Sequence, residues 1–165
     1  MSGVIVYSSS YGSTKQYAEW IRDETGFPMF ESNARSIPWE AKTVVIGCPI
    51  IANKPFLLGW MQKNWDKLRD KNVILFTTSG ADPEAEPVAD WIHSSLTEEM
   101  RKTIRAFPLP GRFQFSQMST AHKAMLRIGA VVMRSAEIKH QIKNPVDGVS
   151  RDRLAPLLAV LKDQA

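Results

Sequence analysis

Three short runs of apolar, mostly β-branched residues stand out along the chain, and none of them alternates with polar positions. They cover residues 3–7, 43–48 and 72–78. Such runs are typical of strands that are buried on both faces, as central parallel strands are. Two weaker runs, 27–31 and 107–111, contain prolines. Because proline cannot donate a hydrogen bond to a strand ladder, we expect these two runs at the edges of a sheet.

Between these runs, apolar residues recur at helical spacing. We predict helices over residues 13–25, 56–68, 86–104 (as one or two helices), 119–135 and 151–162. Strands that alternate with helices indicate βαβ units and a parallel sheet. The sequence therefore predicts an α/β fold with a doubly wound five-stranded parallel sheet and helices on both faces. Placing the proline-containing strands at the edges agrees with the strand order 2-1-3-4-5.

Residues 113–144 fall outside this alternation, and we interpret them as a basic, partly helical insertion between the fifth strand and the last helix. We find no repeat and no dividing linker, so residues 1–165 are expected to form a single domain. Within the insertion, residues 118–143 mix apolar side chains with basic ones, namely Lys123, Arg127, Arg134, Lys139 and Lys143. Two interpretations remain open: a helix that lies in a membrane interface, or a helix packed on the sheet edge.

The junction between the first strand and the first helix carries the most chemistry, because serines and a threonine crowd around Gly12. The first amides of a helix lack intrahelical partners, and the helix dipole favours an anion there. We therefore predict a phosphate-binding loop made of Ser9, Ser10, Tyr11, Gly12, Ser13 and Thr14. The alternative is that Ser13 or Thr14 merely caps the helix, which requires only one hydroxyl.

Other chemistries fit the sequence poorly. It lacks the G-x-x-x-x-G-K-[ST] pattern of nucleoside triphosphatases and the G-x-G-x-x-G pattern of dinucleotide folds. The three histidines are widely spaced, without a carboxylate or cysteine arranged around them, so we expect no metal site. Cys48 is the only cysteine, which excludes an internal disulfide, and we interpret it as a packed thiol.

Residues 4–14 resemble the FMN phosphate loop of flavodoxins, a strand followed by T/S-x-T-G-x-T. Residues 47–50 resemble the G-x-P-I pattern that ends the third strand of flavodoxin-domain proteins, and residues 72–78 match their fourth strand. The resemblance implies a flavodoxin-like fold with FMN as cofactor. The loops after the third and fourth strands would then flank the isoalloxazine ring. They contain Pro49, Ile50, Ile51, Ala52 and Asn53, and Thr78, Ser79, Gly80 and Ala81.

The chain departs from electron-carrier flavodoxins at two points. Carriers usually stack aromatic residues on the ring from both loops, whereas here Ile51 stands in the first loop and the second has no aromatic residue. Ala52 stands where carriers often have a glycine whose peptide flips as the flavin takes up an electron. Positive φ costs alanine more than glycine. From these departures we expect an open ring face and two-electron chemistry.

A net charge of +4, a pI near 9.3 and the late basic insertion are similar to those of flavodoxin-type menaquinone-dependent protoporphyrinogen oxidases. The resemblance implies an FMN-dependent oxidoreductase, with a small-molecule donor such as protoporphyrinogen IX and a quinone as acceptor. Residues 118–143 would contact the inner face of the membrane, and we expect a cytoplasmic location and no nucleic-acid partner. The alternatives are a one-electron carrier flavodoxin that docks to redox partners and a cofactor-free binding module. No catalytic side chain can be named from the sequence.

Overall fold

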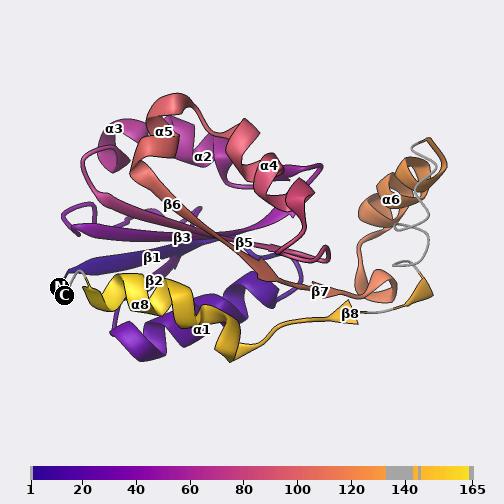
Figure 1. Ribbon diagram of the computed structural model, residues 1–165, viewed down its shortest axis with the longest axis horizontal. Coiled ribbons are helices and arrows are strands. Elements are labelled where there is room, and N and C mark those ends of the chain that lie inside the picture. Colours follow the sequence, from indigo (N-terminus) through magenta and orange to yellow (C-terminus); the bar gives the residue numbers. More distant parts are fainter. Residues whose placement is uncertain (1, 133–142, 145, 164–165) are drawn as a thin grey trace.

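The computed structural model describes residues 2–132, 143, 144 and 146–163, and within them a parallel sheet forms the centre of the molecule (Figure 1). Its strands follow the order β2-β1-β3-β5-β6. They are β1 (Gly3–Tyr7), β2 (Met29–Glu31), β3 (Thr43–Ile51), β5 (Asn72–Ser79) and β6 (Ile104–Pro110). Counted along the chain, these parallel strands have the predicted order 2-1-3-4-5, which confirms the predicted fold class. The short β4 (Lys54–Pro55) pairs antiparallel with the end of β3.

Helices cover both faces of the sheet, with α1 and α8 on one side and α2 to α5 on the other (Figure 1). Their bounds are α1 (Ser13–Thr25), α2 (Leu58–Lys63), α3 (Trp65–Leu68), α4 (Glu86–Ser95), α5 (Glu98–Thr103) and α8 (Ala155–Asp163). The predicted helix 56–68 is divided at Asn64, whose side chain donates to the Trp60 carbonyl at 2.9 Å. The last predicted helix opens with a 3-10 turn, η2 (Arg151–Leu154).

Two apolar layers form the core, one on each face of the sheet. Alternate residues of β1 supply both layers: Val4 and Val6 pack toward α2 to α5, and Ile5 packs toward α1 and α8. The two proline-containing runs supply the edge strands as predicted: Pro28 directly precedes β2, and two prolines lie in β6. The carboxyl ends of β1, β3, β5 and β6 therefore meet at one edge, where loops from distant parts of the sequence lie together.

The inserted segment projects from that carboxyl edge. A two-stranded antiparallel ribbon, β7 (Arg112–Phe113) with β8 (Val146–Asp147), brackets it. Along the chain, β7 is followed by η1 (Phe115–Gln117) and then by α6 (Thr120–Val132). Helix α6 stands apart from both helical layers (Figure 1). The last part of the predicted helix 119–135, together with Arg134 and Lys139, lies outside the described residues. Within the described part of the chain, every helix is too short or too polar to cross a bilayer.

Candidate functional site

Helix α1 begins without a cap from its own side chains. Gly12 occupies the N-cap position with φ 90° and ψ −17°, and no side chain accepts a hydrogen bond there. The first intrahelical bond runs from the Gln16 amide to the Gly12 carbonyl at 2.9 Å, so the amides of residues 13–15 precede it. The first turn also lacks an acidic residue. The alternative that Ser13 or Thr14 merely caps the helix is therefore wrong, and neither a side-chain cap nor an acidic residue of the first turn compensates the positive end of α1.

The hydroxyls around Gly12 hold the loop in shape. Ser9 Oγ accepts from the Gly12 amide at 3.1 Å. Ser13 Oγ accepts from the Arg112 amide at 2.9 Å, which ties the start of α1 to the chain after β6. Both serines act as acceptors in these bonds, so each keeps its hydroxyl proton to donate elsewhere. Hydrogen bonds thus connect the loop at Ser9 and Ser13, and both hydroxyls keep a proton.

Thr14 connects the loop to the end of β5. Its Oγ1 lies 2.9 Å from Thr78 Oγ1, and both side chains are buried. One hydroxyl of the pair donates to the other, which leaves one proton for a further acceptor. This bond fixes the start of α1 against a second carboxyl-end loop, although the two threonines are far apart in the sequence.

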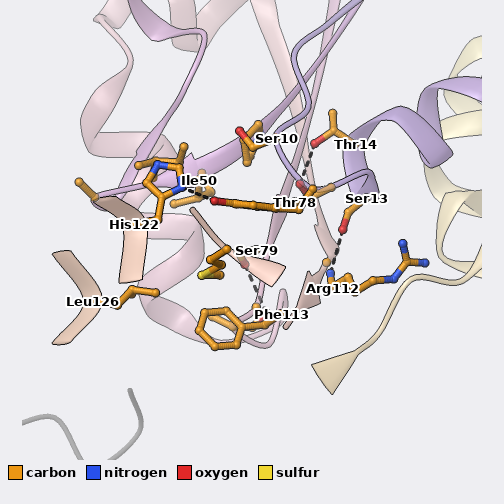
Figure 2. Close-up of a pocket in the computed structure, with 18 of the residues that line it drawn as sticks. Ser10, Ser13, Thr14, Ile50, Thr78, Ser79, Arg112, Phe113, His122 and Leu126 are labelled. Carbon is orange, nitrogen blue, oxygen red and sulfur yellow. Dashed lines mark hydrogen bonds between the residues drawn. The ribbon is translucent and has the colours of Figure 1, made fainter. Parts of the chain in front are cut away.

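A pocket of about 260 Å³ opens beside this loop. Its lining includes every predicted site residue except Gly12: Ser9, Ser10, Tyr11, Ser13, Thr14, Pro49, Ile50, Ile51, Ala52, Asn53, Thr78, Ser79, Gly80 and Ala81. The three loops that the sequence analysis assigned to one site are therefore brought together in space (Figure 2). That these residues bind a ligand remains a prediction.

The far wall of the pocket was missed by the sequence analysis. It comes from α4, the ribbon and the insertion, through Trp91, Gly111, Arg112, Phe113, Met118, His122, Met125 and Leu126. The sequence did mark 118–143 as apolar and basic, but nothing in it indicated that the segment faces the phosphate loop. Aromatic rings are thus present in the pocket although the two flanking loops contain none.

Tyr11 joins the phosphate loop to α6. Its hydroxyl is hydrogen-bonded to Nδ1 of His122, and the two rings meet edge to face with centroids 5.7 Å apart. The Ser119 amide also donates to the Tyr11 hydroxyl, at 3.3 Å. A phenol oxygen can both donate and accept, so it can bond to the Ser119 amide and to the imidazole of His122 at the same time. The inserted helix is therefore held against the pocket by a polar contact.

The loop after β3 is a tight hairpin. Ile51 pairs with Lys54, and the two residues between them have positive φ, 50° at Ala52 and 62° at Asn53. Positive φ at both central positions is the geometry of a type I′ turn. Ala52 thus already has positive φ as part of this hairpin, so the conformational strain at Ala52 does not depend on a redox step. The expectation of two-electron chemistry therefore loses its support from Ala52, whereas the open ring face concerns how a substrate would stack.

Two further sequence interpretations concern groups outside the pocket lining. Cys48 is fully buried, and burial raises the pKa of its thiol to about 12, in agreement with a packed, unreactive side chain. Within the described residues, no group of three histidine, cysteine or acidic side chains is placed to hold a metal ion.

Comparison with known proteins gives one family match. A family model described as a flavodoxin domain matches residues 4–141. A search of the curated proteins finds no match.

Several solved structures are similar to this chain. The Trp repressor binding protein from Bacillus subtilis has 11% identity and a TM-score of 0.52, with 81% of this chain and 98% of that chain covered. A flavodoxin, WrbA-like protein from Agrobacterium tumefaciens has 19% identity and a TM-score of 0.51, with 73% and 87% covered. A flavoprotein in complex with FMN from Lactobacillus acidophilus has 17% identity and a TM-score of 0.49, with 66% and 91% covered. At such identities, the first two structures show a common fold.

Proposed function

This chain belongs to the flavodoxin domain family, and on that premise we propose that it is an FMN-dependent oxidoreductase. The observation that carries the proposal is the start of α1, where Ser13 and Thr14 line a pocket and their amides have neither an intrahelical bond nor a side-chain cap. A phosphate monoester carries close to two negative charges at neutral pH and matches such a site. The flavin supplies the redox chemistry when it is bound, and the protein supplies binding, orientation and electrostatics.

Each part of FMN has matching residues in this pocket. The amides after Gly12 and the hydroxyl protons of Ser9 and Ser13 would hold the phosphate. The loops 49–53 and 78–81 would flank the ring, with their backbone groups available to its polar edge. The first turn of α1 contains no acidic residue that would repel the phosphate.

The far wall would face a substrate rather than the cofactor. Phe113, Met118 and Leu126 contribute apolar side chains to the pocket lining. His122 adds an imidazole, a group that can accept a proton from a substrate as it is oxidised. Its bond to Tyr11 fixes the orientation of the ring. This arrangement fits a flat or apolar reductant that enters between the two flanking loops and α6.

For the reaction itself, we propose a porphyrinogen such as protoporphyrinogen IX as donor and a quinone as acceptor. The support is the resemblance in size, early motifs and basic insertion. Basic side chains also attract the propionates of a porphyrinogen. Met125, Ile128 and Val131 of α6 are 45%, 62% and 72% exposed, and Lys123 and Arg127 lie on the same helix. Such a helix suits the anionic, inner surface of a membrane, where a quinone is available.

The visible spectrum and flavin fluorescence of the purified chain, with and without added FMN, test the cofactor assignment. We expect stoichiometric binding with quenched fluorescence, and a strong loss of affinity when Ser13 and Thr14 are both changed to alanine. A colourless protein that ignores FMN would favour the binding-module alternative. Unchanged affinity in the double variant would remove the phosphate assignment.

Anaerobic incubation with protoporphyrinogen IX and a short-chain menaquinone tests the reaction, with protoporphyrin fluorescence as the readout. Porphyrin formation that requires both the protein and the quinone is the expected result. A protein that binds FMN, turns over no small substrate and forms a salt-sensitive complex with a reductase would favour the one-electron carrier. Pelleting with anionic vesicles, against neutral vesicles as control, tests the membrane contact.

A further inference from the structure

Arg112 lies where the sheet, the phosphate loop and the insertion meet. It is the first residue of β7 and pairs with Asp147 of β8 in the ribbon that brackets the insertion. Its amide donates to Ser13 Oγ at 2.9 Å, so its backbone is fixed to the first residue of α1 (Figure 2). The side chain therefore starts from a well-defined position beside the predicted phosphate site.

The guanidinium of Arg112 is only partly used by the protein. Its Nε donates to Asp147 Oδ2 at 2.8 Å, and the two side chains are 31% and 48% exposed. This bond is the main reason that the pKa of Asp147 is below its usual value. Among the described residues, nothing accepts a hydrogen bond from the two terminal nitrogens. An arginine has five donors, so most of its capacity remains.

The free end of this side chain lies next to the loop glycine. One terminal nitrogen, Nη1, is 4.0 Å from the position that a Cβ on Gly12 would occupy, and it is the nearest atom to that position. Arg112 also lines the pocket, whereas Gly12 does not. The guanidinium and the glycine that precedes the α1 amides are thus neighbours, although they come from two distant parts of the chain.

We infer that Arg112 is a phosphate ligand of the FMN site and selects phosphorylated over unphosphorylated flavin. This inference rests on the proposed function. A guanidinium fits phosphate oxygens with parallel hydrogen bonds, and such charge-assisted bonds are stronger than those to neutral groups. Asp147 holds Nε and leaves the terminal nitrogens to the ligand. The main-chain amides would bind the phosphate from the helix side, and Arg112 would bind it from the ribbon.

A structural role gives a different expectation. If Arg112 only fixes the ribbon through its ion pair with Asp147, then losing either partner should have the same effect. If it binds phosphate, losing Asp147 leaves the guanidinium in place and removes a competing negative charge. The two roles can therefore be separated with Arg112→Ala and Asp147→Asn, each measured with two flavins.

The experiment is a fluorescence titration of flavin-free protein with FMN and, separately, with riboflavin, which lacks the phosphate. We expect Arg112→Ala to weaken FMN binding by about tenfold, a value at the low end for bonds to charged groups because the side chain is partly exposed. Riboflavin binding should stay unchanged, and Asp147→Asn should not weaken FMN binding. Raising the salt concentration should weaken FMN binding to the wild type more than to Arg112→Ala.

Arg22→Ala is the matched control. Arg22 also forms an ion pair with an aspartate, Asp23, and is comparably exposed, but it lies at the opposite end of α1. The Arg22→Ala variant removes the same charge at a residue that does not line the pocket, so the affinity for neither flavin should change. Arg112→Lys keeps the charge but not the paired donors, and serves if Arg112→Ala fails to fold; it should show a smaller but measurable loss for FMN alone.

Three results would overturn the inference: equal FMN affinity for wild type and Arg112→Ala, equal losses for FMN and riboflavin, or a loss in Asp147→Asn as large as in Arg112→Ala. A wild type that binds riboflavin and FMN equally would also count against it. If the wild type binds neither flavin, the proposed function and this inference both fail. The wild-type titration alone gives that result, so it is distinguished from a failure of the inference before any variant is compared.

Discussion

Replacing Gly12 with alanine separates the backbone role of this residue from its role in the site. Gly12 has φ 90° and ψ −17°, a left-handed conformation. The added Cβ would find Arg112 Nη1 at 4.0 Å as its nearest neighbour, so it meets no clash. The change is therefore purely conformational. A left-handed conformation costs an L-residue about 1–2 kcal/mol, part of which is offset because alanine has less freedom than glycine in the unfolded chain.

We expect a net loss of about 1 kcal/mol in the free energy of unfolding, or a fall of about 2–4 °C in Tm for a chain of this size. Gly26→Ala is the matched control. Gly26 ends the same helix with φ 70° and ψ 7°, and the space around its Cβ position is empty. It should lose a similar stability at the other end of α1.

The two variants should differ once FMN is present. A ligand at a hundred times its Kd stabilises the folded state by about 2.7 kcal/mol. Gly26→Ala should keep all of that stabilisation. Gly12→Ala disturbs the turn that directs the amides of residues 13–15, and a tenfold weaker Kd would remove about 1.4 kcal/mol of it. Urea unfolding of both variants, with and without FMN, measures both effects.

Two results would contradict the predicted role of Gly12. If neither variant loses stability, the positive φ is not maintained by the fold. If both variants keep the full stabilisation by FMN, the amides after Gly12 are not the phosphate ligands, whatever the two glycines contribute to folding.

Three further predictions concern buried and paired groups. Thr14→Val and Thr78→Val should each lower the free energy of unfolding by about 1–3 kcal/mol, since each leaves a buried hydroxyl without its partner. In a double-mutant cycle measured by urea unfolding, the double variant should lose less than the sum of the two single losses. Strict additivity would contradict the pairing. Cys48 should react with a thiol reagent far more slowly in the folded than in the unfolded chain. Its raised pKa lowers the thiolate fraction on the order of a thousandfold, and burial keeps the reagent away from the sulfur. Equal reaction rates in the two states would contradict this. The pKa of Asp147 is lowered, mainly by the hydrogen bond from Arg112, so the ionised carboxylate stabilises the fold above the usual pKa of 3.8, and this stabilisation disappears as the pH falls through the lowered pKa. On acidification from about pH 6 to about pH 3, Asp147→Asn should therefore lose less of its free energy of unfolding than the wild type does. Equal losses in the two proteins would show that Asp147 makes no such contribution.

Much of the fold was readable in the sequence because its signals are local. Unbroken apolar runs marked the central strands, and prolines marked the two edges, since a missing donor is tolerated only there. The start of α1 was also predicted at the correct residue, Ser13. Where the sequence failed locally, a single side chain explains it: Asn64 bonds back to the preceding turn and divides a helix whose apolar spacing looked continuous.

The far wall of the pocket could not be read in this way. The three contacts that define the site join Thr14 to Thr78, Ser13 to Arg112, and Tyr11 to His122. None of these pairs has a repeating pattern or a fixed spacing in the sequence. The ribbon that closes the insertion is only two residues long on each side, too short to leave a periodic signal.

The amino-acid sequence alone determined the alternation of strands and helices and the residue at which α1 begins. These follow from hydrophobic burial and backbone hydrogen bonding, which impose periods of two and 3.6 residues on neighbouring positions. The tertiary structure decided that Arg112, His122 and α6 face the predicted phosphate loop. Such contacts depend on where parallel strands bring their carboxyl ends together and on how the intervening segments return, and neither has a local counterpart in the chain.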